Sequence, residues 1–66
     1  MMTTGDCIRI KAAVAAYYPV ALHSGIIIEV ILDDIVPGGY KFLILWANGR
    51  TAAQNASVTE IGWYKL

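Results

Sequence analysis

The sequence lacks the residues with which small domains are usually cross-linked. It has one cysteine, Cys7, and one histidine, His23, among 66 residues. A lone cysteine cannot close an internal disulfide, and one histidine and one cysteine cannot complete a structural zinc site. A domain of about 60 residues buries only about 60% of its unfolded surface, so small folds often need such additional stabilisation. Association with another chain remains as a source of stability.

An excess of either charge is also missing. Five Lys or Arg residues balance five Asp or Glu residues, which gives a formal net charge of zero. Proteins that bind nucleic acid neutralise phosphates with a basic stripe, so nucleic acid is not an expected partner. The N-terminal segment Met1–Asp6 has neither the basic start nor the apolar core of a signal peptide, so we do not expect secretion by that route.

No long apolar helix is expected either. Residues 12–28 carry no formal charge, but Pro19 and Gly25 interrupt them. The stretch is short for a membrane span, which needs about 20 consecutive apolar residues. The sequence therefore does not predict a membrane protein.

No catalytic or metal-binding constellation is visible. Cys7 has no base nearby in the sequence and is expected to pack or to point outward. His23 has no adjacent carboxylate and is expected to face solvent in a loop. Asp33 and Asp34 with Glu29 supply too few oxygen ligands for a calcium loop, which favours a solvated turn. The sequence thus predicts no enzyme activity, cofactor, metal or small-molecule substrate.

Apolar residues, in contrast, are abundant. They make up 58% of the chain, whereas soluble domains average about 45–50%. Two runs, Gly25–Leu32 and Tyr40–Trp46, are apolar on both alternating faces. A half-buried antiparallel strand alternates apolar with polar residues, so continuous apolarity indicates burial on both sides. The second face of each strand is therefore assigned to a partner.

The pattern predicts an all-β fold of five strands. Runs rich in Ile and Val favour strands because β-branched side chains are stiff at χ1. For residues 12–18 we expect an irregular extended loop, because Pro19 disfavours helix in the residue before it; an alanine-rich helix is the alternative. The predicted strands are Cys7–Lys11, Gly25–Leu32, Tyr40–Ala47, Arg50–Ala53 and Ile61–Leu66.

Three local motifs predict how the strands connect. Pro37-Gly38 is typical of a type II turn, because glycine supplies the positive φ. Asn48-Gly49 predicts a two-residue type I′ hairpin that pairs Ala47 with Arg50. The segment Ser57–Glu60 matches a capping box and predicts one helical turn before the last strand.

Several of these segments resemble blocks of small SH3-like β-barrel proteins. The segments Gly5–Lys11, Gly25–Val30 and Leu43–Thr51, with the Ser57–Glu60 turn, are similar to the G-D-x-V, G-x-V-x-x-V and V-x-W-x-N/D-G blocks of that group. Such proteins are widespread in tailed phages, including cyanophages, and KOW modules are related barrels. The resemblance covers Gly5 to Leu66.

The resemblance implies one SH3-like barrel domain over residues 1–66 and a role as a virion component. The expected location is the virion or the cytoplasm of an infected bacterial host, and no catalytic residue is implied. The segments Ala12–Ala16 and Ala52–Ala53 depart from the group's pattern, since polar or bulkier residues are common there. Both departures raise the apolar content and argue against a free monomer.

We therefore expect a structural protein that assembles with itself or with a larger virion protein. The alternatives are a KOW- or SH3-type module that binds nucleic acid or peptide and, less favoured, a small enzyme. Aromatic residues could line a peptide groove or anchor a subunit interface, and the apolar strand faces favour the interface. The candidate interface residues are Ile27, Ile31, Leu43, Leu45, Tyr17, Tyr18, Trp46, Trp63 and Tyr64.

Overall fold

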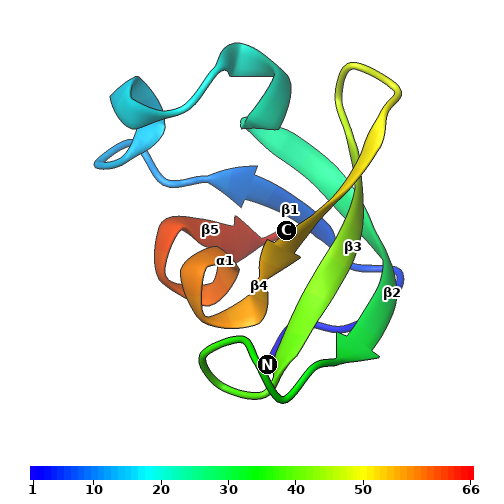
Figure 1. The fold of residues 1–66 in the computed structure, drawn as a ribbon. Coiled ribbons are helices and arrows are strands. Elements are labelled where there is room, and N and C mark those ends of the chain that lie inside the picture. Colours follow the sequence, from blue (N-terminus) through cyan, green and yellow to red (C-terminus); the bar gives the residue numbers. More distant parts are fainter.

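The computed structural model describes residues 1–66 and consists mainly of one antiparallel sheet (Figure 1). Its five strands lie side by side in the order β4-β3-β2-β1-β5. This confirms the all-β fold and the sequence order of the predicted strands. The bounds are β1 Cys7–Ile10, β2 Ser24–Leu32, β3 Tyr40–Trp46, β4 Thr51–Asn55 and β5 Trp63–Lys65.

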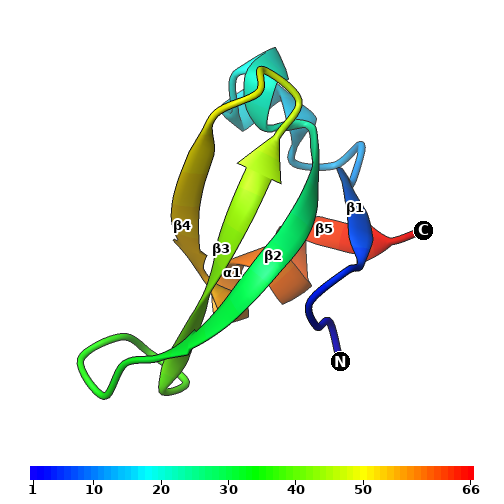
Figure 2. The same cartoon turned by 90° about the vertical axis from the view of Figure 1, so that its right-hand side faces the viewer.

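The sheet curves around the core without closing into a barrel (Figure 2). β4 and β5 are its border strands and are not paired with each other. The helix α1, Ala56–Gly62, connects these two strands and packs against both (Figure 1). The helix thus bridges the end of β4 and the start of β5.

The core lies on the concave side of the sheet. Its largest fully buried side chains include Trp63 and Phe42, and the Trp46 and Trp63 rings are 6.0 Å apart. Met2 also packs into the core, although it precedes the first strand. The buried apolar residues are Met2, Ile8, Ile10, Ile27, Phe42, Ile44, Trp46, Ala56 and Trp63.

β2 contains a β-bulge that interrupts its pairing with β3. Ile27 pairs with Ile44 and Glu29 pairs with Leu43, which leaves Ile28 without a partner. Side chains on a strand alternate between faces, so one extra residue reverses the alternation in the rest of the strand. Odd-numbered residues of β2 therefore face the core before the bulge, and even-numbered residues face it after the bulge.

This reversal corrects the strict alternation predicted for β2. Before the bulge, Ile27 faces the core and Ile26 faces outward, where it is 41% exposed. After the bulge, Val30 packs against the core, and Ile31 pairs with the outward-facing Lys41. Ile26 and Ile31 consequently share the outer face. In a strand without a bulge, two residues five positions apart would lie on opposite faces.

The hairpin between β3 and β4 has a three-residue loop, so the predicted two-residue type I′ turn is wrong. Leu45 pairs with Thr51, and the Trp46 N–H donates to the Arg50 carbonyl at 2.9 Å. Gly49 has φ of 82°, whereas no residue other than glycine has positive φ. A type I′ turn needs positive φ at Asn48 too, whereas a type I turn followed by a left-handed glycine does not. The register therefore moves by one residue.

The other two predicted turns have different outcomes. Gly38 has φ of 85°, and the Gly39 N–H donates to the Val36 carbonyl at 3.0 Å, as in the predicted type II turn. The helical turn before β5 is confirmed as α1, but its N-cap is Asn55 and no side chain caps it. Ser57 lies inside the helix, so the predicted capping box does not form.

The segment between β1 and β2 is an irregular loop, as predicted, but residues 12–17 form turns rather than extended chain. The loop contains two short 3-10 helices, η1 (Ala15–Tyr17) and η2 (Val20–Leu22). His23 was expected to face solvent but is partly buried, and its Nε2 lies 3.0 Å from the carbonyl oxygens of Ala15 and Tyr18. Because both neighbours are acceptors, Nε2 carries the proton and donates. The His23 side chain thus holds η1 against the start of β2.

Candidate interaction surface

The outer face of the sheet gathers apolar side chains from two central strands. In the β2–β3 pairing, Ile26 stands opposite Leu45 and Ile31 stands opposite Lys41, and residues directly opposite each other share a face. Leu43 lies between these pairs on the same side of β3. Ile28, the extra residue of the bulge, is 40% exposed. We define the outer apolar face as Ile26, Ile28, Ile31, Leu43 and Leu45.

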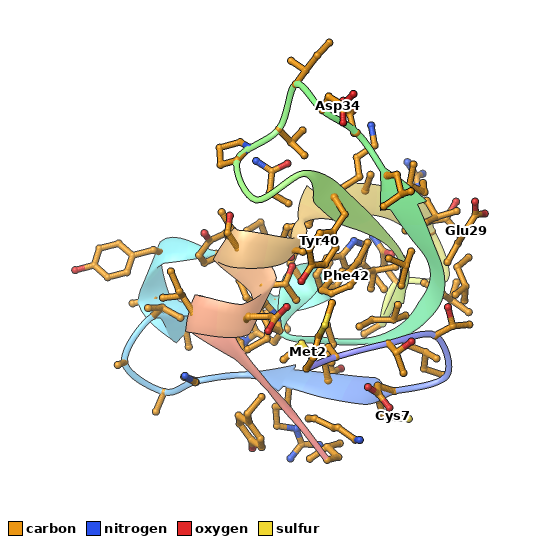
Figure 3. The ribbon with its side chains drawn as sticks, turned by 90° about the horizontal axis from the view of Figure 1, so that it is seen from below. Met2, Cys7, Glu29, Asp34, Tyr40 and Phe42 are labelled. Atoms are coloured by element: carbon orange, nitrogen blue, oxygen red, sulfur yellow. The ribbon has the colours of Figure 1, made fainter.

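Charged and small residues surround this surface. Glu29 pairs with Leu43, while Ala53 and Thr51 of β4 stand opposite Leu43 and Leu45 and are exposed. Figure 3 shows Glu29 and Cys7 on the outside of the curved sheet, with Phe42 and Met2 inside. An apolar centre with a polar border is the usual composition of a protein–protein contact surface.

Of the nine predicted interface residues, three lie on the outer apolar face: Ile31, Leu43 and Leu45. Their side chains are only half-buried in the isolated chain and remain available to a partner.

Three other predicted interface residues lie in the core. Ile27 is fully buried because the bulge follows it, and Trp63 is 1% exposed. Trp46 is 4% exposed and lies on the same face of β3 as Phe42 and Ile44. These side chains already bury their apolar surface within the chain and are not available to a partner.

The three predicted tyrosines occupy different environments. Tyr17 is 82% exposed in η1. Tyr18 packs edge-to-face on Trp63, with ring centroids 4.8 Å apart. Tyr64 is 41% exposed and pairs with Arg9 on the outer side of β1 and β5. Only Tyr64 is therefore on the same side of the sheet as the outer apolar face.

Ile26 lies on the outer apolar face but is not among the predicted interface residues. Pairing of Gly25 with Trp46 puts Ile26 opposite Leu45, which was a predicted interface residue, and so puts both on one face. Gly25 itself permits this pairing, since a Cβ there would lie 2.7 Å from Ile44 Cγ2 and 2.9 Å from the Leu45 carbonyl oxygen. The sequence alone did not specify that close approach.

Two ionisable groups near the turn between β2 and β3 are perturbed. The Ile35 N–H donates to Asp33 Oδ1 at 3.0 Å and Lys41 Nζ lies 3.1 Å from Oδ2, and these contacts lower the pKa of Asp33 below its ordinary 3.8. Desolvation, together with the nearby Glu60 carboxylate, raises the pKa of Tyr40. The Tyr40 hydroxyl donates to Glu60 Oε1 at 3.3 Å. These contacts fix the turn and α1 at the start of β3.

No cavity and no cluster of metal-ligating side chains is found in the chain. Cys7 is exposed at the start of β1 and is paired with Ile26. None of the helices has the length and apolar character needed to cross a bilayer. Comparisons with models of known protein families, with curated proteins and with solved structures found no match.

Proposed function

We propose that the chain is a non-enzymatic assembly protein that docks through the outer apolar face of its sheet. The single observation that carries the proposal is the exposure of Ile26 and Ile28 beside half-buried Ile31, Leu43 and Leu45. The inner face of the same strands is already filled by the chain's own core. A contiguous apolar surface of this kind marks an interaction site in a soluble protein.

The size of the molecule fits this reading. A standard protein–protein interface removes about 800 Å² from each partner. The chain exposes 4107 Å², so such an interface would cover about a fifth of its surface. Burying the exposed part of one isoleucine on this face contributes about 1 kcal/mol, which is about a fivefold change in Kd. Several such side chains together are needed for specific docking.

We further propose that the sheet is an SH3-like barrel left open between β4 and β5. We also propose that the protein is a component of the virion of a tailed phage. The fold proposal is supported by the strand order and by the helix between the last two strands. The phage setting rests on the sequence blocks that resemble this group. The KOW- or SH3-type binding module is less favoured, because Phe42, Trp46 and Trp63 are buried rather than exposed along a groove.

Light scattering of the purified full chain tests the proposed docking surface. We expect oligomers for the unaltered chain, and Leu43→Lys should reduce association at least tenfold, because burying an unpaired charge costs several times the gain from one apolar contact. Ala13→Lys adds the same charge at an exposed loop position and should leave association unchanged. Circular dichroism checks that each variant is folded.

Two outcomes would reject the docking surface. One is a monomer at high concentration, both alone and with isolated virion proteins. The other is equal association of the two lysine variants. Tight, salt-sensitive binding of mixed nucleic acid at low salt would favour the binding-module alternative instead.

A further inference from the structure

The two border strands of the sheet differ in how their free edges are protected. β5, Trp63–Lys65, has three residues, and Lys65 Nζ lies 3.6 Å from Asp6 Oδ1. β4, Thr51–Asn55, has five residues with no charge and no proline, and its register with β3 has no bulge. Charges, prolines, bulges and shortness are the usual protections against pairing with another strand. Figure 2 shows β4 at the border of the sheet with no other segment beyond it.

The free edge of β4 presents a defined set of backbone groups. The Trp46 N–H donates to the Arg50 carbonyl, so these two residues form a hydrogen-bonded pair across the hairpin. In an antiparallel ladder such pairs alternate with non-hydrogen-bonded pairs. With the observed register, Ala52 and Gln54 therefore direct their backbone groups at β3. Thr51 and Ala53 direct theirs away from the sheet.

These outward groups are arranged symmetrically about Ala53. If two copies of β4 run antiparallel with Ala53 opposite Ala53, the two alanines exchange both of their hydrogen bonds. The Asn55 N–H of each copy meets the Thr51 carbonyl of the other. The Asn55 carbonyl is already occupied, because it accepts from Thr59 Oγ1 at 3.0 Å. We propose that a second copy of this chain pairs with β4 in this way and joins the two sheets across a two-fold axis.

The charges near β4 fit a second copy of the chain. The nearest charged residue along the chain, Arg50, precedes the strand by one position, and Lys41, which stands opposite Asn55 on β3, is paired with Asp33 at 3.1 Å. Paired about Ala53, the two Arg50 residues lie about 20 Å apart along the strands, which exceeds the screening length of about 8 Å at physiological salt. No like charges oppose each other in the contact. A two-fold contact also uses the β4 edges of both copies, so pairing through β4 joins two chains and no more.

This inference deepens the proposed assembly function and rests on it for the choice of a protein partner, but it uses a different surface. The outer apolar face lies on the convex side, whereas the β4 contact lies at the border of the sheet. Pairing at β4 would place the outer apolar faces of two copies side by side. The dimer would then offer a larger docking surface than one chain.

Amide exchange measured by NMR on the full chain tests the contact at residue resolution. With about nine in ten chains paired, exchange of the Ala53 amide should slow about tenfold relative to dilute protein, because exchange proceeds from the unpaired fraction. The Ala52 amide bonds to β3 in the monomer and serves as the internal control, with a smaller change. A dimer whose Ala53 amide exchanges equally fast at both concentrations overturns the β4 contact.

Two variants extend this test. Ala53→Pro removes the central outward donor but no bond to β3, so it should abolish the dimer while the fold remains. Leu43→Lys should leave β4 pairing intact. A dimer that is lost in Leu43→Lys and kept in Ala53→Pro would overturn the β4 contact and retain the outer apolar face. The reverse result supports the β4 contact, and the outer apolar face is then tested separately by the association of these dimers with one another, which Leu43→Lys should weaken and Ala13→Lys should not.

A cross-link gives an independent readout if Ala53→Pro fails to fold. Opposed residues in a hydrogen-bonded pair have Cα atoms about 5.5 Å apart, within the range for a disulfide. Ala53→Cys in a Cys7→Ser background should therefore form a disulfide-linked dimer under mild oxidation. Ala13→Cys in the same background is the control for random collision. Equal cross-linking of the two variants contradicts the proposed contact.

Discussion

At the residue scale, a few positions are specified by close contacts rather than by composition. Gly25 of β2 lies so close to β3 that a Cβ would be 2.7 Å from Ile44 Cγ2. Thr59 is fully buried, and its hydroxyl donates to the Asn55 carbonyl at 3.0 Å and lies 3.2 Å from Gln54 Oε1, which ties α1 to β4. Trp63 Nε1 donates to the Leu22 carbonyl at 2.9 Å and holds the β1–β2 loop on the core. Each contact joins segments that are brought together only by folding.

Gly25→Ala should destabilise the chain. The added methyl group must displace Ile44 or the β3 backbone, and overpacking of this kind costs about 1–3 kcal/mol. In a domain of this size each kcal/mol lowers Tm by about 4–8 °C, which thermal unfolding followed by circular dichroism can measure. Gly62→Ala is the matched control, because its Cβ would meet Val14 at an ordinary 3.4 Å. Equal Tm values for the two variants would contradict the close approach.

The lowered pKa of Asp33 predicts a loss of stability in acid. Folding lowers the pKa of the Asp33 carboxyl below its ordinary 3.8, so the carboxylate makes its full contribution to stability above pH 3.8. The contribution is lost as the pH falls through the lower folded pKa. Urea unfolding between pH 6 and about 2.5 should show a steeper loss for the unaltered chain than for Asp33→Asn. Asp34→Asn, next to it, should keep the steeper dependence.

At the element scale, irregularities decide which side chains meet. The bulge at Ile28 reverses the alternation of β2 and brings Ile26 and Ile31 to one face. The three-residue loop after Trp46 shifts the β3–β4 register, so Ala52 stands opposite Ile44 rather than Leu45. A shift of one residue exchanges the two faces of a strand. Neither irregularity changes the positions of the strands in the sequence.

The hairpin loop gives a prediction at this scale. Gly49→Ala should cost about 1–2 kcal/mol, because a residue with a Cβ is forced into the left-handed region. Asn48→Ala should cost less, since it removes only the hydrogen bond from the Arg50 N–H to Asn48 Oδ1, at 3.0 Å. Urea unfolding of both variants measures the difference. Equal costs would support a type I′ turn with positive φ at both positions.

At the scale of the whole molecule, the curved sheet separates a filled inner side from an apolar outer side. The concave side is filled by the chain's own residues, including Met2 from the N-terminal segment and Trp63 from β5. The convex side keeps Ile26 and Ile28 exposed, and the β4 edge is unpaired. The Leu43→Lys and Ala53→Pro experiments address these two surfaces separately. Together they test whether the surplus of apolar residues serves assembly.

Much of the fold could be predicted from local patterns. Ile8 and Ile10 alternate with Arg9 in a strand with one exposed face, and the structure buries both isoleucines. Pro37-Gly38 specifies its turn because only certain residues accept positive φ. The candidate surface was harder to predict, because both faces of β2 and β3 are apolar. Composition could not distinguish Ile26 from Ile27.

Local patterns along the chain were enough to predict the strands, the order in which they follow one another along the chain and an apolar content greater than one small core requires. These properties follow from local preferences and from the alternation of side chains, which any stretch of chain carries with it. The folded arrangement alone places each apolar residue inside or outside, because that placement depends on the bulge at Ile28 and on the register after Trp46. It also decided that β4 and β5 stay unpaired with α1 beside them. Such features depend on pairing between distant segments, which no local pattern specifies.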